Sequence, residues 1–283
     1  MSPNRSPRAS TIRELAWDLR EHASRVRHRA YDLYACRIRR EPEGVTADEL
    51  VTVTPEICTN LLAFSFSMSG WHYLTAVLRE YADHPEVRYH QSVLRHFHDR
   101  YQPSDMSTLV GDDPNITFRP PVGILPWGSF DVALSKTGGC PKDVRQSRQF
   151  GPTDIRGVKW DFSQIRHLYG HVKTEGYRPF GHESGFISGV FLCRNNGERR
   201  FVLLDGTHRC AILSFLGQAV VTMRYAPGCH REIREDDVED WYYVKRGLCS
   251  VSDALAYFHA YFEHNGLERA RRLGLIGAQA TLS

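Results

Sequence analysis

The sequence predicts a mixed α/β protein, and three observations lead to that prediction. Residues 10–102 are dominated by apolar residues at helical spacing. Residues 186–226 hold two short apolar runs around the turn signal RNNGE, followed by a helical pattern and a further apolar run. A last helical pattern covers residues 252–266. Elements in this order make a small α/β or α+β unit with helical segments before and after it.

The chain begins with a short tail and an arginine-rich segment. Residues 1–9 are rich in Pro, Ser and Arg and are expected to be a disordered tail. Residues 1–40 carry a net charge of +6, against +3 for the whole chain. A basic helix of this kind is either a solvated face or a contact with acidic lipid, nucleic acid or an acidic partner.

Three further helices are expected within the helical region 10–102. The sequence TADE at Thr46–Glu49 is a capping box and predicts a short helix into the apolar residues that follow. Residues 70–84 and 86–103 have strong helical patterns, the second of which stops at a proline. This helical region would pack on the α/β unit.

The remainder of the chain divides into three parts. Residues 103–149 are rich in Pro and Gly and are expected to form a packed connection. Residues 150–226 form the α/β unit, which begins with a helix over 161–177. Residues 227–283 are a C-terminal helical extension, whose closing helix at 252–266 ends in Asn-Gly.

Cysteine usage and hydropathy bear on the compartment. The seven cysteines are odd in number, widely spaced and without a C-x-x-C pair, which is typical of reduced thiols. The N-terminus lacks the apolar core of a signal peptide, and no apolar run has the length of a membrane span. These features predict a cytoplasmic protein with no transmembrane segment.

The stretch RFVLLDGTHRCAILSFLG places polar residues where a predicted strand meets a predicted helix. Gly206 allows a tight turn or a positive φ. Thr207, His208 and Arg209 would occupy the first helical turn, whose backbone N–H groups and positive dipole end make a ready anion site. The threonine adds a hydroxyl, the histidine can donate or titrate, and the arginine can fork onto two phosphate oxygens.

Asp205 admits more than one role. It can orient His208 or Arg209, or it can bind Mg²⁺ between phosphate groups. In a purely structural alternative, Asp205 and Thr207 cap the helix while Arg209 pairs with a nearby carboxylate. The pentapeptide D-G-T-H-R, followed by a helix and a strand, is more specific than D-G-T alone and favours the anion site.

The segment VLLDGTHRCAILSFLG resembles the signature of the ParB/sulfiredoxin superfamily, which is a strand, then D-G-x-H-R, then a helix ending in L-G. The resemblance covers about residues 150–226 and implies a ParB/sulfiredoxin-like domain with nucleotide phosphate at this helix N-terminus. Members include partition proteins that bind CTP, sulfiredoxins that use ATP and free serine kinases that use ADP or ATP. The resemblance implies that ATP or ADP, with CTP as the alternative, binds together with Mg²⁺ at Asp205, Gly206, Thr207, His208 and Arg209.

The chain fits the branches of this superfamily unequally. Sulfiredoxins have a catalytic Cys directly before His-Arg, where this chain has Thr207. Partition proteins carry an arginine-rich turn and a downstream helix-turn-helix module, whereas residues 232–240 here are acidic, which disfavours nucleic acid as a partner. Free serine kinases have D-G-H-H-R, the variant most similar to this one.

A kinase of this type needs a base near the acceptor hydroxyl. Free serine kinases use a Glu before their first helix, and this chain offers Asp154, Asp161 and Glu183 in its place, with His208 as a further catalytic residue. The resemblance therefore implies an ATP- or ADP-dependent phosphotransferase acting on a small hydroxyl or sugar-like substrate. The alternatives are a non-catalytic nucleotide-sensing or scaffold protein and a nucleic-acid-binding ParB-like protein.

Segments outside this unit carry a second resemblance. GWHYLTAVLREY, VLRHFHDRYQP, LPWG and RQFGP together are similar to a group of ParB-like proteins encoded with bacterial cell-surface polysaccharide genes. This resemblance covers most of the chain. It implies a role in polysaccharide biosynthesis without specifying a reaction.

Overall fold

The computed structural model describes most of the chain after residue 44. The described residues between 45 and 177 and between 186 and 276 form one compact unit, and the fold given below is that of these residues. Several predictions fall on residues outside the described part of the chain. These are the expected tail, the arginine-rich helix and the part of the expected connection that follows residue 129. The described ranges are 45–111, 113–121, 123–129, 153, 155–179 and 185–276.

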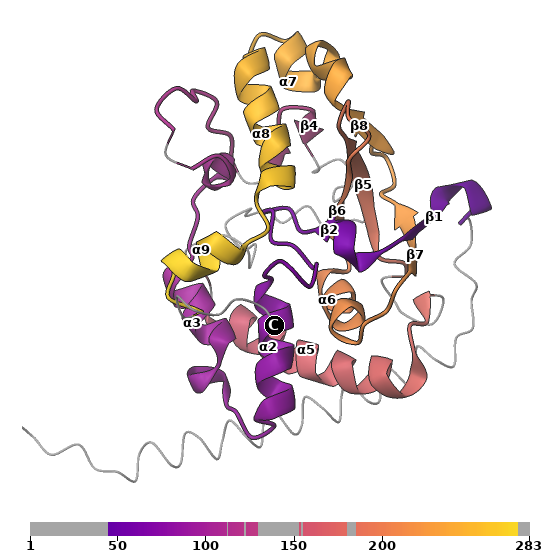
Figure 1. Ribbon diagram of the computed structural model, residues 1–283, viewed down its shortest axis with the longest axis vertical. Coiled ribbons are helices and arrows are strands. Elements are labelled where there is room, and N and C mark those ends of the chain that lie inside the picture. Colours follow the sequence, from indigo (N-terminus) through magenta and orange to yellow (C-terminus); the bar gives the residue numbers. More distant parts are fainter. Residues whose placement is uncertain are drawn as a thin grey trace, which may run out of the picture. The chain divides into compact units, whose positions relative to one another are not determined.

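A mixed β-sheet forms the centre of the unit, so the expected mixed α/β class is confirmed (Figure 1). The strand order is β1-β7-β5-β6-β2, and β8 pairs with β5 beside this path. β1 with β7 and β5 with β6 are antiparallel, whereas β2 with β6, β5 with β7 and β5 with β8 are parallel. The strands are β1 Leu50–Val53, β2 Cys58–Thr59, β5 Ser188–Cys193, β6 Arg199–Asp205, β7 Val221–Tyr225 and β8 Glu232–Arg234.

Helices surround this sheet, and α2, α5 and α6 pack against one another in the lower part of Figure 1. The α-helices are α2 Tyr73–Asp83, α3 Val93–Arg100, α5 Ile155–Glu175, α6 Thr207–Phe215, α7 Tyr242–Lys245, α8 Val251–Glu263 and α9 Leu267–Arg272. The 3-10 helices are η1 Ala47–Glu49, η2 Pro55–Ile57, η3 Tyr89–Gln91, η4 Met106–Leu109 and η7 Glu235–Asp240. A small hairpin pairs β3 Ile124–Leu125 with β4 Gly128–Ser129.

Most of the predicted elements are confirmed. The hairpin β5–β6, the helix α6 and the strand β7 follow one another as expected. The helix predicted over 161–177 is α5, and Gly176 follows its last residue with a φ of 74°. The helix predicted over 252–266 is α8, although it does not close the fold because α9 follows it.

The helix predicted from TADE is wrong. The capping contact forms, since the amide of Thr46 donates to Oε2 of Glu49 at 2.9 Å. Helical structure nevertheless ends after one 3-10 turn, and Leu50–Val53 becomes the strand β1, paired with β7. The alternating β-branched residues of LVTVT favour a strand, and Pro55 follows them closely.

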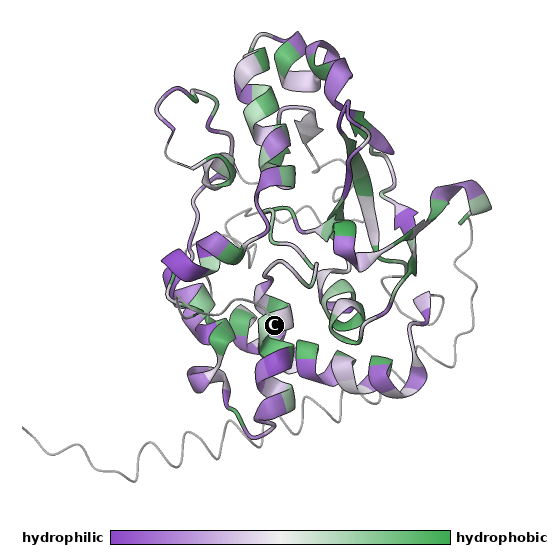
Figure 2. Ribbon diagram, viewed as in Figure 1, coloured by the Kyte–Doolittle hydropathy of each residue, from purple (hydrophilic) through white to green (hydrophobic). Residues whose placement is uncertain are grey.

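A cluster of aromatic rings forms the core on the helical side of the sheet. Phe64 packs edge-on against Trp71, Phe97 and Tyr101, with ring centroids 5.3 to 5.8 Å apart. The guanidinium of Arg269, on α9, lies 4.8 Å from the centre of the Phe64 ring and donates to the carbonyl of Leu62 at 2.7 Å. Although α9 is largely hydrophilic (Figure 2), this arginine fixes it to the core.

Asp253, near the start of α8, holds the loop that contains residues 117 and 118. Its Oδ2 accepts hydrogen bonds from the amides of Thr117 and Phe118 at 3.0 and 2.8 Å and from the Thr117 hydroxyl at 2.9 Å. The residue is only 4% exposed. Burial raises the pKa of this carboxyl group, but the hydrogen bonds from Phe118, Thr117 and Ser250 outweigh burial, so the pKa lies below its ordinary value.

We therefore expect Asp253→Ala to lower the free energy of unfolding by about 2–4 kcal/mol, because two amide donors lose a charged acceptor. The exposed Asp237 provides a matched control, and Asp237→Ala should change stability by less than about 0.5 kcal/mol. Urea denaturation of the three proteins measures both values. Equal stability of the two variants would contradict this role of Asp253.

Candidate functional site

The junction between β6 and α6 is a tight corner at Gly206. This glycine has a φ of 87° and a ψ of 19°, so the expected positive φ is confirmed. A Cβ at this position would lie 2.8 Å from Cγ1 and 3.0 Å from the Cα of Ile187. Both the dihedral angle and the close approach to Ile187 therefore require glycine.

The first turn of α6 is partly open to solvent. Thr207 and His208 are half-buried, and the side chain of Asp205 is 55% exposed. Gly206 offers no side-chain cap, and Thr207 is the first residue of the helix. The first N–H groups of a helix have no acceptor within it, so this turn presents donors and the positive end of the helix dipole.

His208 and Asp161 are brought together from different helices. Nε2 of His208, on α6, lies 3.3 Å from Oδ1 of Asp161, on α5. The aspartate side chain is 7% exposed and the histidine side chain 25%. Nε2 itself is buried and makes no hydrogen bond of good geometry, so the contact is an ion pair only when the imidazole carries a proton. The buried carboxylate is suited to orient and stabilise a charged imidazole.

Arg209 points into the protein rather than toward solvent. Its side chain is 6% exposed, and Nη2 lies 3.1 Å from Oδ2 of Asp205. Asp205 was expected to contact His208 or Arg209, and the structure shows the contact with Arg209. The carboxylate beside His208 is that of Asp161. The same guanidinium acts electrostatically on Tyr177, whose hydroxyl accepts a hydrogen bond from the amide of Ile187 at 3.0 Å. Burial raises the pKa of Tyr177, so the phenol is protonated at neutral pH.

Sequence reasoning missed a buried histidine, His72, that is influenced by the charge of His208. His72 is the N-cap of α2, and its Nδ1 accepts a hydrogen bond from the amide of Leu74 at 3.2 Å. Nε2 of His72 and Oγ1 of Thr75 are both buried without a hydrogen-bond partner. Burial, and then the charge of His208, lowers the pKa of His72 well below its ordinary value. The sequence signal was the position of His72 directly before a strong helical pattern, where it acts as a cap.

The remaining predicted site residues are placed as follows. Glu183 and Asp154 lie outside the described residues. Within the described part of the chain, no group of three or more His, Cys, Asp or Glu side chains is arranged to hold a metal ion. A Mg²⁺ ion at Asp205 would therefore take its other ligands from phosphate oxygens and water. The thiol of Cys210 is fully buried, and burial raises its pKa well above the ordinary value.

Comparisons of the chain with protein-family models, with curated proteins and with solved structures found no match. No helix among the described residues has the length and apolar character needed to cross a membrane.

The corner at Gly206 gives a stability prediction with an internal control. Gly217 also has a positive φ and follows α6, but a Cβ there would meet no atom within 4 Å. Gly217→Ala should cost about 1 kcal/mol for the left-handed backbone alone. Gly206→Ala should cost about 2–4 kcal/mol because it adds the contact with Ile187. Equal losses in chemical denaturation would show that this contact is unimportant.

His72 makes stability depend on pH. Because its pKa is lowered in the folded state, only the unfolded state binds a proton at His72 as the pH falls below about 6.5. Stability should therefore decrease on acidification. His72→Asn keeps an oxygen to cap α2 but does not titrate.

Between pH 7.5 and 5.5 the wild-type free energy of unfolding should fall by about 1.4 kcal/mol more than that of His72→Asn. Urea titrations at the two pH values measure this difference. Parallel pH dependence of the two proteins would mean that His72 is protonated in the folded state.

Proposed function

We propose that the chain is a ParB/sulfiredoxin-like nucleotide-binding protein that transfers a phosphoryl group from ATP or ADP to a small hydroxyl or sugar-like substrate. The observation that carries the proposal is the β6–Gly206–α6 corner with the His208–Asp161 pair beside it. A sugar-like acceptor would agree with a role in cell-surface polysaccharide biosynthesis.

The order of elements around the corner supports the family assignment. The hairpin β5–β6, the glycine turn, α6 and the parallel partner of β5, which is β7, follow one another along the chain. The D-G-x-H-R signature requires this strand–turn–helix arrangement. The positive φ of Gly206 places Thr207 and His208 at the start of the helix, where the signature needs them.

Phosphate binding follows from the donors at this corner. The amides of the first turn, the Thr207 hydroxyl and the dipole of α6 all favour a negative charge in front of Gly206. Arg209 would assist from within, either by turning from Asp205 to a phosphate oxygen or by holding the Asp205 carboxylate in place. Phosphoryl transfer depends mainly on positioning and charge neutralisation, which donors of this kind supply.

Asp205 would be a ligand of the magnesium ion, because a half-exposed carboxylate beside a phosphate site is a usual Mg²⁺ ligand. The ion would neutralise negative charge on the transferred phosphoryl group.

His208 and Asp161 would handle the proton of the acceptor. Transfer breaks the bond between the terminal phosphorus and its bridging oxygen, forms a bond from phosphorus to the acceptor oxygen, and releases the hydroxyl proton. Nε2 of His208 is buried and faces Asp161, so Nδ1 is the nitrogen that would accept this proton. The Asp161 carboxylate would stabilise the resulting imidazolium. Glu183 is the alternative base in this proposal.

The test measures nucleotide binding and turnover separately. Isothermal titration with ATP, ADP and CTP in the presence of Mg²⁺ gives the dissociation constants. Thr207→Ala should weaken binding by about tenfold, because one hydroxyl donor to phosphate is lost. Nucleotide consumption with a panel of sugars and amino alcohols, followed by phosphorus NMR, then identifies the acceptor class.

His208→Gln should lower kcat by about 100-fold or more while the dissociation constant of the nucleotide changes little. His171→Gln, a half-exposed histidine on α5, is the matched control and should behave as wild type. Nucleotide binding without turnover for any acceptor would support a sensing protein instead. Absence of nucleotide binding, or full activity of His208→Gln, would contradict the proposal.

A further inference from the structure

A small polar cavity lies at the opposite end of β6 from Gly206. Its volume is about 200 Å³. The strand β6 spans Arg199–Asp205, so Arg200 at the cavity and Asp205 at the corner are roughly 16 Å apart. The cavity is therefore separate from the proposed nucleotide site. The polar side chains that matter for its chemistry are Glu56, Ser65, Ser67, Ser69, Arg200 and Glu263.

Three serine hydroxyls form a ladder along one wall of the cavity. Oγ of Ser65 donates to Oγ of Ser67 at 3.0 Å, and the amide of Ser67 donates back to Ser65 at 3.0 Å. Oγ of Ser67 and Oγ of Ser69 lie 3.3 Å apart, and either can be the donor. Because the second contact can reverse, the ladder can either donate to or accept from a guest molecule.

The backbone holds this ladder in place. A Cβ on Gly70 would lie 2.8 Å from Cβ of Ser65 and 2.8 Å from Oγ of Ser67, so only glycine allows the segment to fold so tightly. The carboxylate of Glu56, on η2, is held against the same segment. Its two oxygens accept from the amide of Met68 at 3.1 and 3.3 Å. The polar groups are thus positioned before any ligand arrives, which lowers the entropic cost of binding.

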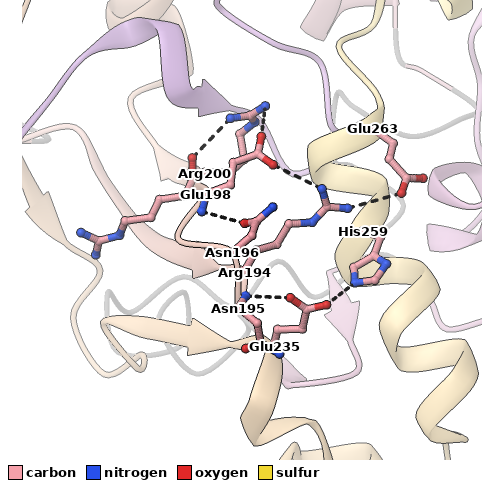
Figure 3. A network of polar contacts seen from close by, with 9 residues as sticks. Arg194, Asn195, Asn196, Glu198, Arg200, Glu235, His259 and Glu263 are labelled. Atoms are coloured by element: carbon pink, nitrogen blue, oxygen red, sulfur yellow. Dashed lines mark hydrogen bonds and ion pairs between the residues drawn. The ribbon is translucent and has the colours of Figure 1, made fainter.

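The charged groups at the rim are balanced by one another, as Figure 3 shows. Nη2 of Arg200 lies 2.9 Å from Oε1 of Glu198. Arg194 bridges the other oxygen of Glu198 at 3.2 Å and the carboxylate of Glu263 at 3.4 Å. Its guanidinium also lies over the ring of Phe262, 4.5 Å from the ring centre. This network leaves no strong excess of positive charge at the cavity.

We propose that this cavity binds a small neutral polyhydroxylated molecule of about the size of one monosaccharide. An anion needs mainly donors and a metal cation or an amine mainly acceptors, whereas a hydroxyl group both donates and accepts. The cavity supplies both, through the reversible serine ladder, the fixed acceptor Glu56 and the donor Arg200. It is smaller and more polar than the apolar pockets that bind larger organic ligands.

The test uses glucose, galactose, myo-inositol and glycerol as neutral probes and inorganic phosphate as a charged probe, without nucleotide. Saturation-transfer NMR and titration of the full chain measure binding. At least one neutral probe should bind saturably, with a dissociation constant in the millimolar range or below, and phosphate should not compete with it. Ser67→Ala should weaken that binding by about fivefold, and Ser252→Ala, an exposed serine on α8, should not.

Glu56→Gln provides a second variant, because its amide oxygen can still accept from Met68 while the charge is lost; it too should weaken binding. Absence of saturable binding by every neutral probe up to about 100 mM would overturn the proposal. Binding that is unchanged in both Ser67→Ala and Glu56→Gln, or binding of phosphate in place of the neutral probes, would also overturn it. Thr207→Ala and His208→Gln should leave probe binding unchanged, so failure of this site and failure of the nucleotide site are distinguishable.

Discussion

The close contact between Gly206 and the backbone of Ile187 is the constraint on which the candidate site depends. Because glycine has no Cβ, the chain can pass this close to Ile187 with a positive φ. It therefore leaves β6 at Asp205 and enters α6 at Thr207, with only Gly206 between them. Since α6 then packs on α2 and α5, the direction taken at Gly206 determines where His208 lies. A side chain at this position would collide with Ile187, and the shift needed to relieve the collision would disturb the placement of His208 beside Asp161.

The polar side chains at the corner form two layers, an outer layer that is open to solvent and an inner layer that is buried. The outer layer contains the half-exposed Thr207 and the exposed Asp205, which can meet a ligand in solvent. The inner layer contains the buried Asp161 and Arg209, whose charges are each opposed by a side chain of the outer turn. Buried charges are costly unless they are paired, and paired buried charges of this kind are common at sites that handle charge.

Local sequence signals were sufficient for much of this architecture. The RNNGE turn, the spacing of apolar residues in α5 and α6 and the glycine after the Asp205 carboxylate each act within a few residues, and each is confirmed. The helix expected after Thr46 failed because Leu50 pairs with Arg224, far along the chain, and no local signal reports that pairing. The same reason applies to the site. Asp161 was one of several carboxylates available to the corner, and only the packing of α5 against α6 selects it as the partner of His208.

The most direct test of this account is a crystal structure of the protein with a non-hydrolysable ATP analogue and Mg²⁺. We expect phosphate oxygens within hydrogen-bond distance of the amides of Thr207 and His208, with the acceptor side of the terminal phosphate facing the His208 ring. A nucleotide bound elsewhere, or a first turn of α6 that is covered by the protein's own side chains and makes no phosphate contact, would contradict it.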